Sequence, residues 1–369
     1  MSPTIIPTKT STTPRNPEHQ RAVAKIYNSA IAACAIPAAW EVGLLDAIQK
    51  QGSVDILKFA TSNNLDSDSL RGVAFTLATA GVVSYDAATT TISPGLLFEE
   101  TFCTKSMFHW LTLSSGGLFT RLHKVLHVEQ RHPEWEGNTY QRDPAGVAYS
   151  CRELNRQFYD PVFWKVVDGV AKDYAFKKVV DLGCGSGERL MQILARFPDA
   201  NGLGIDVAGP AIDFAESEAK ARGFAADGPG EEKRLTFSVG DARRLEARPE
   251  FADADLLTSF LMGHDFWPRE NCVKTLQWFK KLFPNAKRFL LGDETRGLLY
   301  SAGSKAPYTG GDVPIFALGL ELGHVLMDVY IPTMEEWYGV FEEGGWRCVR
   351  AYELEQPAFA AIFELEPIA

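Results

Sequence analysis

The stretch Lys178-Val-Val-Asp-Leu-Gly-Cys-Gly-Ser-Gly-Glu188 decides the fold, because an apolar strand runs into a glycine-rich turn and then into a helix. Gly183, Gly185 and Gly187 let the backbone approach a ligand closely, and the helix expected from Glu188 to Phe197 offers its N-terminal amide groups. The spacing is G-x-G-x-G, whereas a dinucleotide fold has G-x-G-x-x-G. The stretch therefore predicts a nucleotide-type cofactor site that is not a dinucleotide site.

From residue 175 onward, strands alternate with helices, which is typical of a parallel sheet with crossover helices. Thr333 and Glu336 predict a capping box for a helix that ends at Gly344, and two successive strands then form a hairpin. A seven-stranded α/β sheet of the Rossmann-like class I methyltransferase type has this ending, and its cofactor is S-adenosylmethionine (SAM). The expected strands are Lys178–Leu182, Gly202–Val207, Leu235–Val239, Ala254–Leu261, Lys287–Gly292, Trp346–Glu355 and Ala358–Glu366.

The first half of the chain is mostly helical. We expect a disordered tail over residues 1–20, a helical domain over 21–174 and the SAM-binding domain over 175–369. Within the helical domain, a helix over Ser67–Ala80 and two short strands, Val82–Tyr85 and Thr91–Ile92, give a winged-helix outline. The helix carries one basic residue, so we favour dimerisation over DNA binding and expect a homodimer; a SAM-sensing transcription regulator is the alternative from another class.

Composition limits the partners and the compartment. The 369-residue chain has a net charge of −10, which argues against nucleic acid as a partner. Its six cysteines are far apart and include no C-x-x-C pair, so we expect a reduced, cytoplasmic protein. The longest apolar run, Ala30–Trp40, is too short to span a bilayer and contains Pro37.

Acidic residues at the ends of the predicted strands are candidates for cofactor binding. Asp206 closes the second strand, where a carboxylate accepts both ribose hydroxyls. Asp241, after Gly240, would lie near the adenine amino group, and Asp181 would order the loop or contact the amino-acid end of the cofactor. Arg189 is expected to be a side chain on the helix surface.

Two histidines are expected where the transferable methyl group should lie, because ligands bind beyond the carboxyl ends of the strands. His264 follows the fourth strand of the sheet and His324 lies in the insert after the fifth. Their convergence predicts a mononuclear metal site, iron or zinc, that a 2-oxo acid could chelate. Asp265 either holds a metal-bound water or orients an imidazole of this site, or it caps a helix that opens at Pro268.

The chain resembles the 2-oxo acid C-methyltransferases of peptide-antibiotic pathways, from about Arg21 to Glu366. The motifs that carry the resemblance are Phe108-His-Trp110, Tyr140-Gln-Arg-Asp143, Met262-Gly-His-Asp-Phe-Trp-Pro-Arg-Glu-Asn-Cys272 and Phe341-Glu-Glu-Gly-Gly-Trp-Arg-Cys348. The resemblance implies metal ligation by His264 and His324. It also implies that Ser115 and Arg142 bind the substrate carboxylate and that Trp110 forms a pocket wall.

The sequence leaves several acceptors of the methyl group open. Asp328, beside Val329 at the expected substrate pocket, could pair with a guanidinium, which suggests similarity to 5-guanidino-2-oxopentanoate 3-methyltransferases. The alternatives are C-methylation of phenylpyruvate or 4-methyl-2-oxopentanoate, and metal-independent O-methylation in which His264 is the general base. For C-methylation, the base that removes the C3 proton is open, with Asp265 or a metal-bound hydroxide as candidates.

Overall fold

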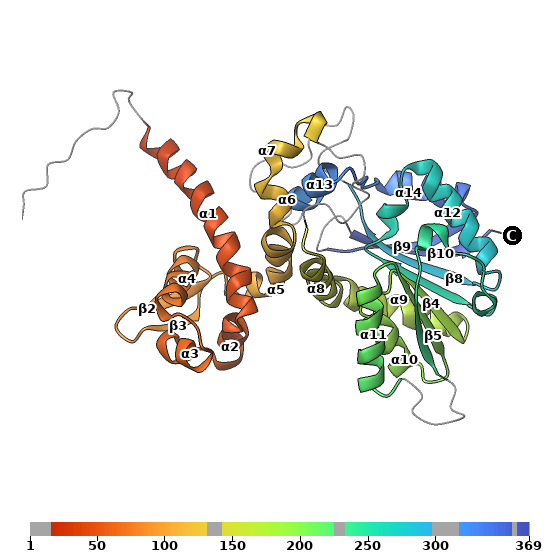
Figure 1. Ribbon diagram of the computed structural model, residues 1–369, viewed down its shortest axis with the longest axis horizontal. Coiled ribbons are helices and arrows are strands. Elements are labelled where there is room, and N and C mark those ends of the chain that lie inside the picture. Colours follow the sequence, from red (N-terminus) through yellow and green to blue (C-terminus); the bar gives the residue numbers. More distant parts are fainter. Residues whose placement is uncertain (1–15, 131–141, 225–232, 297–316, 356–359, 369) are drawn as a thin grey trace, which may run out of the picture. The chain divides into compact units, whose positions relative to one another are not determined.

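The computed structural model describes residues 16–130, 142–224, 233–296, 317–355 and 360–368 (Figure 1). The chain divides into two compact units, Met1–Leu113 and Ser114–Ala369. The sequence placed this division at residue 174, which is later than the structure has it. The difference arises because helix α9 (Asp160–Asp173) packs in one apolar cluster with the strands, through Phe163, Val167 and Val170.

The first unit is helical with a small sheet. Helix α1 begins at Pro17, after the N-cap Asn16, so Pro17–Gln20 are helical and not part of a disordered tail; the rest of the expected tail, 1–15, lies outside the described residues. The strands form an antiparallel sheet in the order β1-β3-β2, which gives the winged-helix outline. The elements are α1 (Pro17–Glu41), α2 (Leu44–Gln51), β1 (Val54–Asp55), α3 (Ile56–Ser62), α4 (Ser67–Thr79), β2 (Val83–Asp86), β3 (Thr91–Pro94) and α5 (Phe98–His109), followed by the π-helical turn η1 (Trp110–Ser114).

Helix α1 exposes apolar side chains along its N-terminal half. Val23, Ile26 and Tyr27 are 65%, 73% and 69% exposed, whereas Ala39 and Trp40 near the other end are buried. Among the described residues, α1 is the one helix long and apolar enough to cross a membrane by length and composition, which the sequence had not indicated. The buried core helix of a protein can meet the same criteria, so this finding does not assign α1 to a membrane. The expected homodimer and the expected cytoplasmic location stay predictions.

The second unit contains the large sheet. It begins with α6 (Gly116–Thr120), α7 (Leu122–Val125), the short η2 (Val128–Gln130), α8 (Pro144–Leu154), the π-helical η4 (Asn155–Tyr159) and α9. Strands and helices then alternate: β4 (Lys178–Leu182), α10 (Glu188–Arg196), β5 (Asn201–Asp206), α11 (Gly209–Ala221), β6 (Leu235–Val239), the 3-10 turns η5 (Ala242–Arg244) and η6 (Pro249–Phe251), β7 (Leu256–Phe260), η7 (Gly263–Phe266), α12 (Arg269–Leu282) and β8 (Arg288–Glu294). The chain ends with α13 (Ala317–Leu326), α14 (Met334–Glu343), β9 (Trp346–Glu353) and β10 (Ala360–Pro367).

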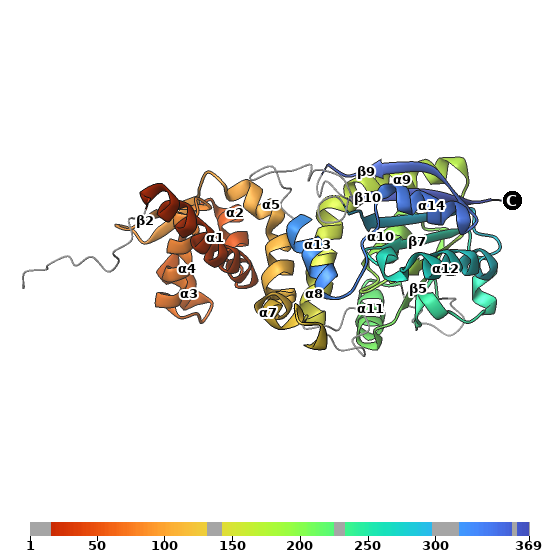
Figure 2. The ribbon, with the colours of Figure 1, turned by 90° about the horizontal axis from the view of Figure 1, so that it is seen from above.

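The seven strands have the order β6-β5-β4-β7-β8-β10-β9, and β10 runs antiparallel to both of its neighbours. In Figure 2 the β9 and β10 hairpin lies toward one edge of the sheet and β5 toward the other. The capping box that opens α14 is present, with the Thr333 hydroxyl accepting from the backbone of Glu336. These features confirm the class I methyltransferase sheet predicted from the sequence.

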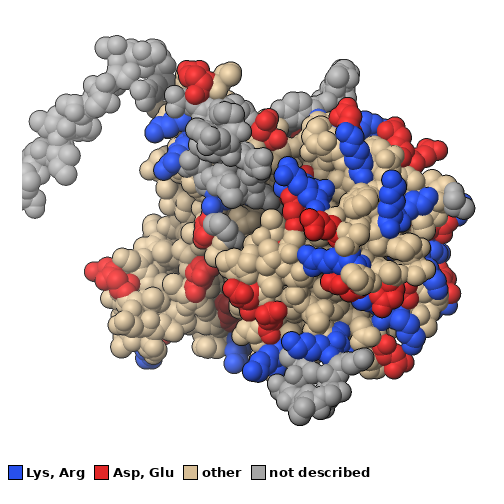
Figure 3. Space-filling model, turned by 45° about the vertical axis from the view of Figure 1, so that its right-hand side comes forward, with Lys and Arg blue, Asp and Glu red and all other residues tan. Residues whose placement is uncertain are grey.

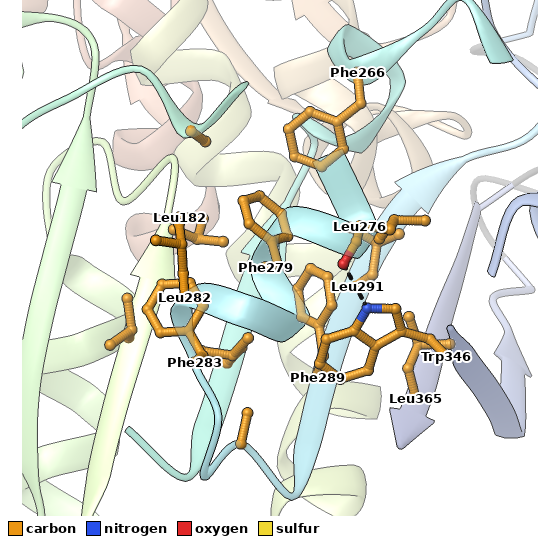
Figure 4. Packing of buried hydrophobic residues seen from close by; sticks show 14 of the residues in the cluster. Leu182, Phe266, Leu276, Phe279, Leu282, Phe283, Phe289, Leu291, Trp346 and Leu365 are labelled. Atoms are coloured by element: carbon orange, nitrogen blue, oxygen red, sulfur yellow. Dashed lines mark hydrogen bonds between the residues drawn. The ribbon is translucent and has the colours of Figure 1, made fainter. Parts of the chain in front are cut away.

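Two apolar layers enclose the sheet. One contains side chains of α9, α10 and α11, and the other contains side chains of α12 and α14. Figure 4 shows part of the second layer, where Phe279 and Phe289 pack together and the Trp346 indole donates a hydrogen bond to the Leu276 carbonyl, 2.9 Å. This packing fixes the carboxyl ends of the strands, from which the candidate site is built.

Charged side chains of both signs are interspersed over the face shown in Figure 3. Ion pairs of the second unit include Arg269 with Glu343 and Arg222 with Glu188. The expected absence of a nucleic-acid partner stays a prediction.

Candidate active site

The glycine turn between β4 and α10 has a backbone conformation that favours glycine, and two of its three glycines are closely packed. Gly183, Gly185 and Gly187 all have positive φ angles, +76°, +51° and +70°. A Cβ on Gly187 would lie 2.5 Å from the Phe237 ring, and a Cβ on Gly183 would lie 2.8 Å from the Met262 sulfur. Conformation therefore favours glycine at all three positions, and close packing adds to this at Gly183 and Gly187, whereas a Cβ on Gly185 would meet no atom within 4 Å.

Asp206 joins the glycine turn to the end of β5. One carboxylate oxygen accepts a hydrogen bond from the Gly185 amide, 2.9 Å, and the other accepts from the Ala208 amide, 2.9 Å. Each oxygen keeps a second lone pair, so the carboxylate can still accept from a ribose diol as the sequence predicts.

Asp241 and Gly240 follow β6. The Asp241 carboxylate caps η5 by accepting from the Arg243 amide, and it also receives both guanidinium contacts of Arg243 at 3.0 Å. The pKa of Asp241 is lowered, since these hydrogen bonds outweigh its partial burial. A contact of Asp241 with adenine stays a prediction.

Asp181 and Arg189 lie behind the glycine turn. Asp181 is 4% exposed and accepts a hydrogen bond from the Thr258 hydroxyl, 2.6 Å. The Arg189 side chain is only 9% exposed, so the expectation of a surface residue is wrong. The first turn of α10 faces η4 and β7, and the guanidinium is enclosed between them.

His264 is held rigidly by Asp293, which lies near the end of β8. Its Nδ1 is 2.7 Å from one Asp293 oxygen, and its backbone amide donates to the other, 2.8 Å. A Cβ on the preceding Gly263 would lie 2.7 Å from the same carboxylate. Asp293 therefore fixes both the ring and the backbone of His264, and leaves Nε2 to face a ligand.

His324 lies on α13 with its ring edge-on to that of His264. The ring centres are 5.1 Å apart, at an interplanar angle of 87°. The Nδ1 of His324 is 2.7 Å from the Leu320 carbonyl, which can only accept, so Nδ1 carries the proton and the lone pair of the neutral ring is on Nε2. The structure thus brings together the two histidines that the sequence singled out.

The two imidazoles differ in charge. Burial alone would lower the pKa of His264, but the charges of Asp293, Asp265 and Glu294 outweigh it and raise the pKa to about 9. Burial, together with the charges of His264 and Arg142, holds the pKa of His324 well below its usual range. At neutral pH and without a bound ion, the pair is one imidazolium and one neutral imidazole, so a bound ion would displace the His264 proton.

The donor set fits a two-histidine metal site. Each ring has Nδ1 committed to an acceptor, a carboxylate for His264 and a carbonyl for His324, which is the arrangement that orients histidine ligands of metals. The described residues include no group of three or more His, Cys, Asp or Glu suited to hold a metal. The two histidines would thus hold an ion weakly unless substrate oxygens completed its coordination.

The residues expected to handle the substrate carboxylate lie in the same unit. Ser115 is fully buried, and its hydroxyl has no hydrogen-bond partner among the described residues. The Asp143 amide donates to the Ser114 carbonyl, 2.8 Å, which holds the chain at Arg142 beside Ser115. Arg142 is 9% exposed and its charge acts on His324, so it lies close to the histidine pair.

The other predicted residues have different environments. Asp265 has an oxygen 4.0 Å from His264 Nε2 and does not cap α12, which begins after Pro268. Asp328 is exposed in the turn after α13, with a φ angle of +61°, and Val329 packs partly buried against the cluster of Leu326 and Met327. Trp110 is buried in the first unit, and its role as a pocket wall stays a prediction.

Sequence reasoning missed Asp293 and its neighbour Glu294. Both are buried, and the Tyr159 hydroxyl donates to Glu294, 3.0 Å. They lie at the carboxyl end of a parallel strand, which is the signal that identified Asp206 on β5.

The buried acids make stability depend on pH. Burial, followed by the charge of Asp293, raises the pKa of Glu294 from 4.5 to about 8. The folded state therefore binds this proton more tightly than the unfolded state. The free energy of unfolding falls as pH rises from 4.5 to about 8. The raised pKa of His264, about 9, acts in the same direction, because the stability it adds below pH 6.5 is lost as pH rises through its folded value.

We expect the free energy of unfolding, measured with urea, to be smaller at about pH 9 than at about pH 6. Glu294→Gln keeps an oxygen for the Tyr159 hydroxyl but cannot ionise, so it should reduce this difference. An unchanged difference would show that Glu294 is ionised in the folded protein across the whole range.

Comparisons with known proteins agree with this architecture. A methyltransferase-domain family matches residues 179–283. The chain is 51% identical over 344 residues to Methyltransferase ungE' of Aspergillus campestris (strain IBT 28561), covering 93% of this chain and 96% of the relative. It is 25% identical over 221 residues to an indolepyruvate C-methyltransferase of Streptomyces griseus, covering 59% and 60% of the two chains.

The fold is shared with solved enzymes of lower identity. The O-methyltransferase NcsB1 from neocarzinostatin biosynthesis, solved in complex with SAM, superposes with a TM-score of 0.57 at 17% identity, covering 91% of this chain and 96% of that one. Together with the glycine turn and Asp206, the long match to a methyltransferase at 51% identity is decisive. The chain belongs to the SAM-dependent methyltransferases.

Proposed function

We propose that this enzyme transfers the methyl group of SAM to the C3 carbon of a 2-oxo acid, with a metal ion held by His264 and His324. The observation that carries the proposal is the histidine pair itself, whose ring centres are 5.1 Å apart and whose Nδ1 atoms are both engaged elsewhere. The relative that acts on indolepyruvate supports a 2-oxo acid as the acceptor.

The reaction replaces a C3–H bond with a C3–CH3 bond. The methyl–sulfur bond of SAM breaks, S-adenosylhomocysteine leaves, and the proton from C3 passes to a base. A bound metal would supply Lewis-acid stabilisation of the charge that develops on the 2-oxo group, worth several kcal/mol. The chain's own groups bind and orient: Asp293 fixes the His264 ring, and in this proposal the buried Ser115 and Arg142 bind the substrate carboxylate.

O-methylation with His264 as the general base is the alternative proposal. A general base and a metal ligand both need the neutral ring of His264, whose pKa Asp293 raises to about 9, so its protonation state does not separate the two roles. The similarity to O-methyltransferases of 17% identity concerns the fold and does not favour this chemistry.

The side chain of the acceptor is proposed to be aromatic. The guanidino substrate suggested by the sequence depended on Asp328, and this carboxylate is exposed in the turn after α13. An exposed ion pair contributes little to binding a guanidinium. The aromatic acceptor named for the Streptomyces relative therefore makes an aryl 2-oxo acid the better choice.

A mass-spectrometric screen tests this assignment. The purified enzyme is incubated with SAM and each of indolepyruvate, phenylpyruvate, 4-methyl-2-oxopentanoate, 5-guanidino-2-oxopentanoate and a simple phenol, with and without a chelator. We expect methylation of an aryl 2-oxo acid, loss of one deuterium from a C3-deuterated substrate, and loss of activity on chelation that iron or zinc restores. A methyl ether formed in the presence of chelator would establish O-methylation instead.

A further inference from the structure

We propose that Tyr330 is a positioning residue of the two-histidine site, because it ties the segment that carries His324 to the segment that carries His264. Its ring packs against Trp267 and sets the separation of the two imidazoles, and its hydroxyl fixes the direction of the side chain. This role rests on the proposed function, since it explains how the histidine pair is held ready for an ion. It also accounts for Trp267, which belongs to a motif of the sequence but has no part in the proposed chemistry.

Tyr330 follows the turn that ends α13. His324 lies in the last turn of this helix, and its carbonyl accepts hydrogen bonds from the amides of Met327, 3.1 Å, and Val329, 2.9 Å. Asp328, between these two residues, has a φ angle of +61°, so the chain turns sharply here. Val329 directly precedes Tyr330 in the chain. A displacement of Tyr330 therefore moves the backbone to which the His324 ring is attached.

The ring of Tyr330 packs on the ring of Trp267. The ring centres are 5.0 Å apart, at an interplanar angle of 33°. Trp267 follows η7, and its amide donates to the His264 carbonyl, 3.3 Å. Trp267 also lies edge-on to the buried Trp337, whose ring is 3.1 Å from the Cβ position of Gly263. The aromatic contacts of Tyr330 thus lead to the residues on both sides of His264 in the chain.

Polar groups fix the other end of the Tyr330 side chain. Its hydroxyl donates to one Glu336 oxygen, 2.6 Å, and accepts from Arg296 Nη2, 2.8 Å. Arg296 is anchored in turn, because its amide donates to the Pro332 carbonyl, 2.8 Å. The second Glu336 oxygen accepts from the Thr333 amide in the capping box of α14, 2.8 Å. Both partners of the hydroxyl are therefore held in place, and Tyr330 is fixed at its polar end as well as at its ring.

The chain offers a matched control in Tyr338 of α14. Tyr330 is 37% exposed and Tyr338 is 42% exposed, so replacing either residue removes a similar amount of buried surface. The Tyr338 ring packs edge-on against Phe363 of β10, at 6.1 Å between the ring centres, instead of against a residue of η7. A general loosening of the fold would follow from both substitutions, whereas only the replacement of Tyr330 removes a link between the histidines.

Two substitutions separate the ring of Tyr330 from its hydroxyl. Tyr330→Phe keeps the ring contact with Trp267 and loses the polar contacts with Arg296 and Glu336. Tyr330→Ala loses both kinds of contact. Thermal unfolding and SAM affinity, measured by calorimetry, show that each variant is folded, and SAM should bind to all of them as it does to the wild type.

The first measurement uses metal-free protein and reports the separation of the histidine rings. The ring centres of His264 and His324 are 5.1 Å apart, which is close enough for a nuclear Overhauser effect between their ring protons. We expect this effect in the wild type and in Tyr338→Ala. It should be weaker in Tyr330→Phe and lost in Tyr330→Ala.

The second measurement is the affinity of the metal-free protein for zinc chloride, by calorimetry. Tyr330→Ala should bind zinc about 10-fold more weakly than the wild type, the lower end of the range for residues that orient a histidine ligand. Tyr330→Phe should lie between the two, and Tyr338→Ala should match the wild type. The double variant Trp267→Ala, Tyr330→Ala should bind zinc no more weakly than Trp267→Ala alone, because both changes remove the same contact.

Two results would overturn this role of Tyr330. One is a Tyr330→Ala protein that keeps both the ring-to-ring effect and the zinc affinity of the wild type. The other is a Tyr338→Ala protein that loses them to the same extent. A wild-type protein that does not bind zinc would contradict the proposed metal site instead. The ring-to-ring effect in metal-free protein would still test Tyr330, so the two failures are distinguishable.

Discussion

Replacing His324 with alanine is expected to reduce methyl transfer by at least ~10²-fold while SAM continues to bind. The separation follows from the architecture, because His324 is on α13, whereas Asp206 ends β5 and the glycine turn and Asp241 follow β4 and β6. Turnover is measured as S-adenosylhomocysteine released, SAM affinity by calorimetry, and iron and zinc content by plasma mass spectrometry. Loss of the metal together with activity would support the two-histidine site.

The control for this variant is His109→Ala, which removes a buried histidine of the first unit that pairs with Glu41. His109 is not a proposed metal ligand, so the His109→Ala enzyme should retain its metal. A His324→Ala enzyme that lacks metal and is fully active would contradict the metal-assisted mechanism. A His324→Ala enzyme that keeps the wild-type metal content would show that the ion is held elsewhere.

Replacing Asp293 is expected to damage both stability and catalysis. The carboxylate is fully buried and accepts from the His264 ring, the His264 amide and the Glu294 amide, at 2.7, 2.8 and 2.8 Å. Asp293→Ala leaves the His264 charge unpaired in the interior, which costs about 3–5 kcal/mol in the free energy of unfolding. Urea unfolding measures this cost, and a loss under about 1 kcal/mol would contradict the buried ion pair.

The variant Asp293→Asn removes the charge of this residue and keeps its shape. The amide fills the same space but cannot offset the imidazolium, so the pKa of His264 should fall from about 9. An NMR titration of the ring measures that shift. Activity should fall about 10- to 100-fold, as for other residues that orient a histidine ligand. A normal titration with normal activity would show that the backbone contacts alone position His264.

The central strands of the large sheet, such as β4 and β7, were predictable because they are short, largely apolar and buried segments. The expected spans Lys178–Leu182 and Leu235–Val239 coincide with β4 and β6, and the other strand boundaries differ by a few residues. The division between the units was not predictable, because the apolar face of α9 gives no sign of which layer it packs against. Its partners, such as Leu190 and Leu256, are far away in the sequence.

The site was predictable where it follows the ends of strands. Asp206, His264 and His324 were found in this way, and the structure brings the two histidines together. Arg189 was assigned wrongly because its partners, Asn155 and Phe260, come from segments 34 residues before it and 71 residues after it. Such enclosure is a property of tertiary packing, and the sequence of α10 does not contain it.

His264 is held by more hydrogen bonds than His324. This difference suggests which side of the site could change when the enzyme acquires new acceptors. His264 is clamped by Asp293, and Gly263 beside it tolerates no added atom. The ring of His324 is anchored by a carbonyl of its own ten-residue helix, on which Leu318 and Leu322 are exposed. Divergence among homologues, and laboratory evolution of acceptor range, should therefore accumulate on α13 and leave the η7 side of the site unchanged.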